Sequence, residues 1–412
     1  WPLAKPGLSQ SSHPIPFDPG NSAAGALDGG EGTRISYDAV RSIKLREASD
    51  TGEDTAHQTR RGHSHSGVPA GGLVPHQGLP RPGFAPAFTL AFALLSAAGS
   101  VPPAAGQDLP DFLGVAGGSS RGVLCGEGRI LFSHADQLGW NWFPAEGADS
   151  SLIYTCAALA GSRFVVAAEN GSVWRSTGPE GYVFEPVGST GASGVRALAQ
   201  AGPRLVAVGD GGSIALSTDL GAATWRAEPS PVTTTLRGVA SNGVTSTVAV
   251  GEDGVVLRAG VFANNWQRVA IQETEDFHGV LVRPNGQYVA FGSSGTLWLG
   301  QGDGLTWTLL PEFTAVSFHG GASVGSLMIL VGDDGSIHVS AGQPGDPGSW
   351  RLTPSPTSQR LRAVAWTGVR AVAVGEASTV LWSSVGWVWI QTPVVPTREM
   401  SWGALKKLMR ER

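Results

Sequence analysis

The sequence has 412 residues, of which 59 are glycine and 27 are proline, while charged residues make up only 15%. A chain of this kind, also rich in Val, Ala, Ser and Thr, favours short strands joined by tight turns and excludes a mainly helical protein. The 28 basic and 33 acidic residues give a formal charge of −5, without the basic surplus that nucleic-acid binding needs. We therefore expect an all-β protein with no nucleic-acid partner.

Residues 1–80 show neither strand alternation nor a sustained helical stripe. This pattern predicts a disordered or untranslated N-terminal extension outside the fold. The histidines of this stretch, His57, His63 and His65, have no scaffold on which to form a metal site. No zinc motif, phosphate-binding loop or serine nucleophile elbow is recognisable in the chain, so we expect neither a metal nor a cofactor.

Residues 81–106 have the organisation of a secretory signal peptide. Arg81 precedes an apolar run over residues 84–99, and small residues follow at 102–106. The run is shorter than the roughly 20 residues of a membrane-spanning helix and contains Pro86. We expect export with cleavage near Gly106, and hence a secreted or periplasmic protein. A membrane tether or an apolar linker is the alternative.

From residue 107 to 392 one pattern recurs seven times: an apolar strand, a loop, a strand ending in glycine, a tight turn, a third strand and an aromatic residue. The period is about 41 to 43 residues, the length of a four-stranded propeller blade. The blades start near Phe112, Tyr154, Val195, Leu236, Phe277, Phe318 and Leu361. The closing aromatic residues are Trp142, Phe184, Trp225, Trp266, Trp307, Trp350 and Trp389.

The second strand and its turn align best among the repeats, as in the segment Val206-Ala-Val-Gly-Asp-Gly-Gly212. Each such segment predicts a β-hairpin, because glycine permits the positive φ of a tight turn. Seven blades close into a ring that leaves no long edge exposed. The repeats therefore predict an all-β fold, a seven-bladed β-propeller of four-stranded antiparallel blades.

The repeats resemble the BNR/Asp-box group, and within it the repeat family of the photosystem II assembly factor of chloroplasts and cyanobacteria. The resemblance covers residues 112–392 and rests on the strand-turn segments and on one Asp-box, formed by Ser217, Asp219, Gly221 and Trp225. Blades 1, 6 and 7 keep a serine and a tryptophan without the box aspartate. The resemblance implies the fold, whereas function has to be argued from a site.

Catalysis is not expected from these repeats. A sialidase-like propeller needs an arginine cluster and a tyrosine nucleophile, yet Tyr154, Tyr182 and Tyr288 all lie in strand or closing positions. Glycoside hydrolysis needs two carboxylates that face each other across a cleft, whereas the acids here lie on hairpin turns.

Two charged sets recur at fixed positions in the blades, and both are expected at one end of the ring because neighbouring strands alternate in direction. The second residue of the innermost strand is basic in blades 3 to 7: Arg196, Arg237, His278, His319 and Arg362. The turns after the second strands carry Glu127, Glu169, Asp210, Glu252, Asp253, Asp333, Asp334 and Glu376. These groups either lock blades together as ion pairs or contact a partner protein, and both interpretations stay open.

Cys125 and Cys156 align with buried Val or Ala of other repeats, which predicts two inert core thiols. A disulfide is the alternative if their Cα atoms come within about 7 Å in an oxidising compartment. Residues 393–412 form a tail that includes a candidate short basic helix around Trp402 and Leu405.

Together these features predict an exported, monomeric propeller that binds a protein partner as an assembly factor or interaction scaffold and is not an enzyme. A carbohydrate-binding or sialidase-like glycoside hydrolase propeller is the alternative. That alternative requires a polar pocket with facing carboxylates at the ring centre.

Overall fold

The computed structural model describes residues 109–134 and 141–392, all within one compact unit, Pro86–Arg412. The predicted N-terminal extension (1–80), signal peptide (81–106) and C-terminal tail (393–412) lie outside the described residues.

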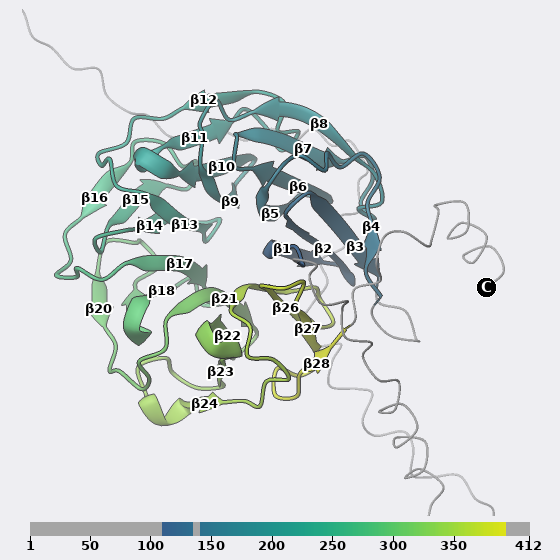
Figure 1. The fold of residues 1–412 in the computed structure, drawn as a ribbon. Coiled ribbons are helices and arrows are strands. Elements are labelled where there is room, and N and C mark those ends of the chain that lie inside the picture. Colours follow the sequence, from purple (N-terminus) through teal and green to yellow (C-terminus); the bar gives the residue numbers. More distant parts are fainter. Residues whose placement is uncertain (1–108, 135–140, 393–412) are drawn as a thin grey trace, which may run out of the picture. The chain divides into compact units, whose positions relative to one another are not determined.

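The strands of the described ranges form seven antiparallel sheets, each built from four consecutive strands (Figure 1). Blades 1 and 2 contain β1 (Phe112–Gly118), β2 (Arg121–Gly126), β3 (Arg129–His134), β4 (Phe143–Pro144), β5 (Tyr154–Ala160), β6 (Arg163–Ala168), β7 (Ser172–Ser176) and β8 (Phe184–Ser189). Blades 3 and 4 contain β9 (Val195–Ala201), β10 (Arg204–Gly209), β11 (Ile214–Ser217), β12 (Trp225–Ala227), β13 (Leu236–Ser241), β14 (Ser246–Gly251), β15 (Val256–Gly260) and β16 (Gln267–Val269). Blades 5 and 6 contain β17 (Phe277–Val282), β18 (Tyr288–Gly292), β19 (Leu297–Gly300), β20 (Trp307–Leu309), β21 (Phe318–Val324), β22 (Leu327–Gly332), β23 (Ile337–Ser340) and β24 (Trp350–Leu352). Blade 7 contains β25 (Leu361–Trp366), β26 (Ala371–Gly375), β27 (Val380–Ser383) and β28 (Ile390–Gln391). The predicted seven-bladed β-propeller is confirmed.

Short 3-10 turns complete the described secondary structure: η2 (Asp210–Gly212), η3 (Ser293–Gly295), η4 (Asp333–Gly335) and η5 (Pro347–Ser349). No helix among the described residues is long and apolar enough to span a bilayer.

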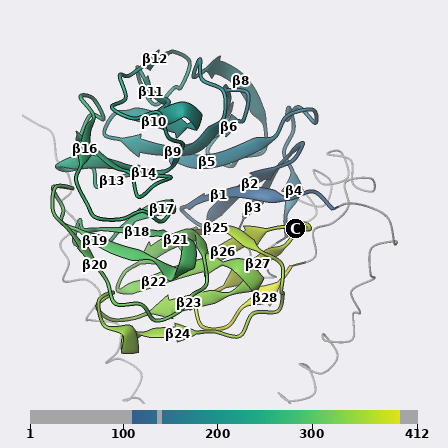
Figure 2. The ribbon, with the colours of Figure 1, turned by 60° about the vertical axis from the view of Figure 1, so that its left-hand side comes forward.

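The first strand of each blade lies innermost and contacts the first strands of both neighbouring blades. Figure 1 shows β1, β5, β9, β13, β17 and β21 around the centre and β4, β8, β12, β16, β20, β24 and β28 on the outside. Figure 2, turned by 60°, shows the sheets of blades 4 and 5 stacked one next to the other. Because β25 of blade 7 also contacts β1 of blade 1, the ring is closed.

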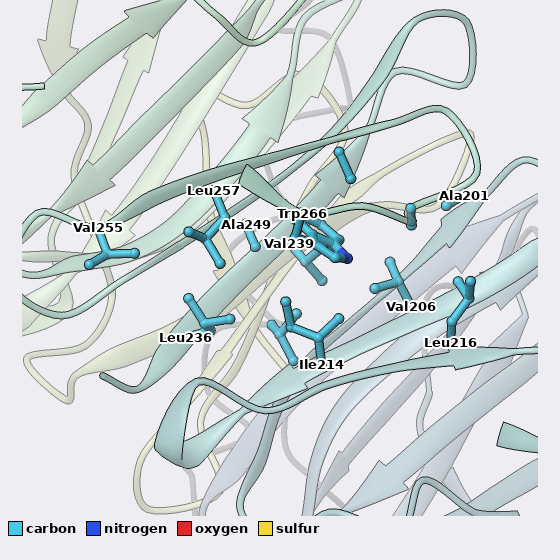
Figure 3. Packing of buried hydrophobic residues seen from close by; sticks show 13 residues of the cluster. Ala201, Val206, Ile214, Leu216, Leu236, Val239, Ala249, Val255, Leu257 and Trp266 are labelled. Atoms are coloured by element: carbon cyan, nitrogen blue, oxygen red, sulfur yellow. The ribbon is translucent and has the colours of Figure 1, made fainter. Parts of the chain in front are cut away.

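The hydrophobic core is divided among the interfaces between neighbouring blades. Each core cluster of the described chain combines side chains from two adjacent blades, and one of them joins blade 7 to blade 1. Between blades 3 and 4, Ile214 and Val206 pack with Val239 and Leu257 around Trp266 (Figure 3). A single blade therefore cannot bury its faces alone, and the ring is the unit of folding.

The turn between the second and third strands places two consecutive residues at positive φ in blades 3 to 6. In blade 5 these are Ser294 (φ 54°) and Gly295 (φ 75°). A Cβ at Gly295 would lie 1.9 Å from the Thr314 carbonyl oxygen, so both the φ angle and the close approach require glycine. Blade 7 instead uses Ala377 (φ 52°) and Ser378 (φ 57°).

Blade 7 differs because its turn receives the segment that precedes β1. The Ser378 N–H and hydroxyl both donate to the Pro110 carbonyl oxygen at 3.0 Å. The Ala377 N–H donates to Asp111 Oδ1 at 3.0 Å. Since each described sheet contains strands of one blade only, these contacts and the shared core join the two ends of the ring.

Each innermost strand also has a β-bulge near its start, where the register with the second strand shifts by one residue. In blade 3, Val195 pairs with Gly209 and Ala197 with Val208, so Arg196 is left without a cross-strand partner. A bulge bends the strand and re-aims the unpaired side chain. The bulge residues are Leu113, Thr155, Arg196, Arg237, His278, His319 and Arg362.

Candidate functional site: a charged mouth of the ring

The bulge residues lie at the end of the ring that carries the turns between second and third strands, here called the turn end. Four arginines with carboxylate partners and two histidines gather there, and we call this set the charged mouth. Its basic members are Arg196, Arg237, His278, His319, Arg360 and Arg362. The β-bulges explain the gathering of all of these side chains except Arg360, because they take them out of the strand alternation. Arg360 directly precedes β25.

Each bulge arginine is paired with the first acid of the turn in its own blade. Arg196 forms the most complete pair: Nε donates to Asp210 Oδ1 at 2.9 Å and Nη2 to Asp210 Oδ2 at 2.8 Å. Arg237 Nη2 donates to Glu252 Oε1 at 2.6 Å. In blade 7, Arg362 Nη2 donates to Glu376 Oε1 at 2.7 Å.

The arginines also reach a neighbouring blade. Arg196 Nη2 lies 3.5 Å from Glu169 Oε1 of blade 2. Arg237 Nη2 lies 3.9 Å from Asp276 Oδ2 of blade 5. Arg362 Nη2 lies 3.9 Å from Asp111 Oδ2, directly before blade 1. The ion pairs predicted as one interpretation of these residues are therefore present, and they cross blade boundaries.

Two histidines replace arginine in blades 5 and 6, and their rings stack. The ring centroids of His278 and His319 lie 4.7 Å apart, with 12° between the ring planes. His278 Nδ1 donates to the Phe318 carbonyl oxygen at 2.9 Å, which leaves Nε2 to accept from the Ser293 hydroxyl at 3.3 Å. His319 Nε2 donates to Asp333 Oδ1 at 2.8 Å.

The remaining turn acids take other roles. Glu127 of blade 1 accepts the Asp111 N–H at 3.3 Å through Oε2. Asp253 and Asp334 are exposed at the second turn position and, among the described side chains, form no ion pair. Of the acids predicted for the mouth, the first one in each turn is thus engaged, while these two are free to meet solvent.

Three mouth residues were missed by the sequence analysis: Asp111, Asp276 and Arg360, which directly precede an innermost strand. This position faces the turn of the preceding blade. Arg360 contacts Asp333 Oδ1 through Nε at 2.6 Å and Glu376 Oε1 through Nη1 at 3.4 Å. Asp276 Oδ1 accepts the Asp253 N–H at 3.1 Å. The signal in the sequence is a polar residue immediately before the apolar strand start, which recurs in all blades except 2 and 3, where Ile153 and Gly194 hold the position.

The pairing shifts the pKa values of several mouth groups. Hydrogen bonds from Arg196 lower the pKa of Asp210 and, reciprocally, Asp210 raises the pKa of Arg196. Burial by itself raises the pKa of Asp333, but hydrogen bonds from His319 and Arg360 outweigh it and the net shift is downward. Burial lowers the pKa of His319, despite its bond to Asp333, which acts in the opposite direction. The Arg196–Asp210 and Arg360–Asp333 pairs are therefore ionised near neutral pH.

A cavity of about 530 Å³ opens beside Arg196 between the turns of blades 2 and 3. It is lined by both carboxylates that contact Arg196, Glu169 and Asp210, and by the connector residues Ser193 and Gly194. Ile153, which is 41% exposed, adds an apolar wall. At one edge of the mouth, the cavity therefore combines two carboxylates, a connector segment and an apolar side chain.

The four residues of the Asp-box form a structural turn on the opposite end of blade 3. The Ser217 hydroxyl accepts the Leu205 N–H and donates to the Asp219 carbonyl oxygen, each at 2.7 Å. Asp219 Oδ1 accepts the Gly221 N–H at 2.7 Å, and the Trp225 indole N–H donates to the Ala222 carbonyl oxygen at 2.8 Å.

Similar turns occur in two blades in which the sequence analysis found no box aspartate. In blade 5, Asp303 Oδ1 accepts the Leu305 N–H at 2.9 Å and Trp307 bonds a carbonyl three residues earlier. In blade 6, Asp346 Oδ1 accepts the Gly348 N–H at 2.9 Å. Asp346 lies six residues after Ser340, whereas Asp219 lies two residues after Ser217, so Asp346 caps a turn outside the spacing of the box.

The two cysteines are buried free thiols, and the alternative of a disulfide between them is not realised. Cys125 packs in the core between blades 1 and 2, whereas Cys156 packs between blades 2 and 3. Burial raises the pKa of both thiols, that of Cys156 to about 12. Their side chains therefore belong to different interfaces.

The tyrosines occupy structural positions. Tyr154 is fully buried and its hydroxyl accepts the Asp149 N–H at 2.7 Å. The Tyr288 hydroxyl donates to the Ser246 carbonyl oxygen of the preceding blade at 2.7 Å. Among the described residues no group of three or more His, Cys, Asp or Glu side chains is placed to hold a metal ion.

The closed ring of antiparallel blades and its charged mouth define the class of the protein: a seven-bladed β-propeller. Solved structures of YCF48, a photosystem II assembly factor, share this fold. YCF48 bound to D1 peptide aligns with a TM-score of 0.54 and 15% identity, over 67% of this chain and 93% of that chain. YCF48 from Cyanidioschyzon merolae aligns with a TM-score of 0.53 and 14% identity, over 68% of this chain and 97% of that chain.

These solved structures belong to the family that the repeats resemble, and at such identities the likeness concerns the fold. No protein-family profile matches the sequence, and no curated protein matches it significantly.

Proposed function

We propose that the protein is an exported, non-catalytic scaffold that binds or assembles other proteins and holds a segment of its partner at the charged mouth. The observation that carries the proposal is the exposure of the mouth arginines, which lies between 33% and 42% although each one is already fixed by a carboxylate. Groups that are held in place before binding lose little conformational entropy when a partner arrives.

The sign of the charge at the turn end favours a basic segment. In the described turns between second and third strands and the strand starts beside them, the arginines are Arg129, Arg196, Arg237, Arg360 and Arg362. The carboxylates are Asp111, Glu127, Glu169, Asp210, Glu252, Asp253, Asp276, Asp333, Asp334 and Glu376. This surplus produces a negative field that attracts lysine and arginine side chains of a partner and speeds their encounter.

The structural neighbours support a protein partner. A YCF48 structure contains D1 peptide, so a propeller of this fold accommodates a segment of another protein. With 15% identity the peptide itself does not carry over to this chain. The proposal is therefore limited to the class of partner, a protein segment.

The electrostatics of the mouth argue against glycoside hydrolysis. A glycosidase needs a carboxyl group with a raised pKa to act as general acid. In the cavity beside Arg196, the carboxyl group of Asp210 has the opposite shift, because Arg196 stabilises its ionised form. Asp210 and Glu169 therefore act as ion-pair partners of Arg196.

The proposal of export rests on the apolar run at residues 84–99 and the small residues at 102–106, outside the described residues. Cell fractionation together with N-terminal sequencing of the mature chain tests it. A mature N-terminus near Gln107 in an envelope or culture fraction is the expected result. Intact, full-length chain in the cytoplasm contradicts export.

The binding proposal is tested with two variants of equal charge change. Asp253→Asn with Asp334→Asn removes two exposed carboxylates from the turn end without breaking an ion pair, and asparagine tolerates positive φ. Glu180→Gln with Glu185→Gln removes two carboxylates from the opposite end. Immobilised full-length chain is incubated with native envelope extract at low and raised salt, and captured proteins are identified by mass spectrometry.

We expect capture by the wild type and by the second variant, with capture by the first variant weakened several-fold. Raised salt should weaken capture as well, because the attraction is screened. Equal capture by all three chains excludes the charged mouth as the binding site.

A further inference from the structure

Blade 6 contains a second cavity, away from the charged mouth. Its volume is about 530 Å³, within the range of sites for small molecules. It lies between the connector that precedes the blade, with Thr314 and Val316, and the connector that follows it, with Thr353 and Thr357. Turn η4 separates it from the mouth: Asp333 pairs with His319, while Asp334 lines the cavity.

Two buried polar groups of the cavity wall lack hydrogen-bond partners among the described residues. His338 on β23 is 6% exposed and its Nδ1 atom is unpaired. Ser336 is 9% exposed and its hydroxyl is unpaired as well. Buried polar groups are nearly always satisfied, so each unpaired one calls for a binding partner. Both residues line the cavity.

The position of His338 is apolar in every other blade. The strand register places it opposite Leu330 of β22. The residues at the same register position in blades 1 to 5 and 7 are Leu131, Trp174, Ala215, Leu257, Trp298 and Leu381. In blade 5, the Trp298 indole fills this space and its N–H donates to Glu273 of the adjoining connector at 2.8 Å. Blade 6 thus places a hydrogen-bonding side chain where every other blade has an apolar one.

The surroundings of His338 select an uncharged ligand. The rings of Phe313 and Phe318 meet the imidazole edge-on, with centroids 5.5 and 5.3 Å away. Burial lowers the pKa of His338 to about 4, so the ring is neutral near pH 7 and offers one N–H and one lone pair. The carboxylate of Asp334 at the edge disfavours anions.

We infer that this cavity binds a small uncharged molecule carrying an amide or hydroxyl group, which hydrogen-bonds to His338 Nδ1 and to the Ser336 hydroxyl. Amide and hydroxyl groups can both donate and accept hydrogen bonds, so one such group can bond to a neutral imidazole and to a serine hydroxyl at the same time. The remaining wall, with Val316 and Pro354, receives the apolar part of the ligand. This site is independent of partner binding at the charged mouth.

The experiment observes His338 directly. Full-length chain labelled with ¹⁵N-histidine is titrated with N-acetylglutamine amide, with glucose and with the charged control N-acetylglutamate amide. Long-range ¹H–¹⁵N spectra report the ring nitrogens, and His338→Leu identifies the His338 signal by its loss. Leucine holds this register position in blades 4 and 7, so the variant is expected to fold.

We expect a saturable shift of the His338 Nδ1 signal with the amide or with glucose, and none with the charged control. Ser336→Ala should weaken the binding of that probe about tenfold by removing one hydrogen bond. His338→Trp, which fills the cavity as Trp298 does in blade 5, should abolish binding, measured by calorimetry, with an unchanged circular dichroism spectrum. The inference is wrong if neither neutral probe gives a saturable shift, or if His338→Trp binds as the wild type does.

Discussion

His278 and His319 stack across the boundary between blades 5 and 6, with their ring centroids 4.7 Å apart and their planes within 12° of parallel. The contact joins two blades at the mouth, where blades 3, 4 and 7 use arginine-carboxylate pairs. Both rings have a lowered pKa: burial and then the neighbouring His319 lower that of His278, and burial lowers that of His319. A neutral stack is therefore part of the folded state at neutral pH.

Acidification should destabilise the ring through this stack. The folded-state pKa of both histidines lies below the unfolded value, so the unfolded chain takes up protons first. The contribution of the two neutral histidines to the free energy of unfolding should be fully present above about pH 6.5 and should decrease as the pH falls below that value. Urea unfolding followed by tryptophan fluorescence between about pH 7.5 and 5 measures this loss.

The matched variant for this prediction is His278→Thr. Thr155 holds the same bulge position in blade 2, where its hydroxyl donates to the Val195 carbonyl oxygen at 2.6 Å. Threonine should keep the bond to the next blade while removing one titrating ring, so the variant should lose less stability on acidification. His338→Leu separates the contribution of His338. An identical pH dependence in wild type and His278→Thr contradicts the prediction.

The turn glycines should tolerate side chains very unequally. Gly295→Ala should lower the free energy of unfolding by more than about 1 kcal/mol, because φ is 75° and the new Cβ would meet the Thr314 carbonyl oxygen. Gly211→Asn is the control: φ is 63°, no atom lies within 4 Å, and Asp253 occupies the same turn position in blade 4. Its cost should stay below about 1 kcal/mol. Equal losses in a denaturant titration would show that close approach to the connector has no role.

The serines at the end of the third strand should also differ in how much stability is lost when alanine replaces them. Ser217→Ala should cost about 1–3 kcal/mol, because it leaves the Leu205 N–H and the Asp219 carbonyl group without their partner. Ser133 holds the equivalent place in blade 1, and its buried hydroxyl has no hydrogen-bond partner among the described residues. Ser133→Ala should therefore cost at most about 1 kcal/mol. Thermal unfolding measures the stability of both variants. A larger loss in Ser133→Ala than in Ser217→Ala would contradict the prediction that the hydrogen bonds of Ser217 stabilise the fold.

The thiols should be unreactive in the folded chain. Thiolate is the nucleophilic form, and burial raises the pKa of Cys125 and Cys156. Iodoacetamide should leave the native protein unmodified and add two groups once the chain is unfolded without reductant. Mass spectrometry counts the groups. An unfolded chain that takes up none would reveal a disulfide.

Much of the fold follows from local signals. The segment Val206-Ala-Val-Gly-Asp-Gly-Gly212 predicts a hairpin because only certain residues accept positive φ, and its recurrence predicts the blade. The five basic bulge residues of the mouth were found in the same way, by their position in the repeat. Asp276 and Arg360 were missed because each contacts the turn of the preceding blade. The pattern within a single repeat does not show such a contact. Asp303 was missed because its residue spacing differs from that of the Asp-box, although its carboxylate accepts a backbone N–H as Asp219 does.

The sequence by itself determined the number of blades, the hairpin turns and the residue types that recur at the turn end, since these depend on patterns within one repeat. Only the tertiary structure decided which acid each arginine meets, that His278 and His319 stack, and that His338 faces a cavity. The physical reason is that a one-residue bulge re-aims the side chain. Its partners lie both in the turn of its own blade and in a neighbouring blade, whose distance and angle arise only when the ring closes.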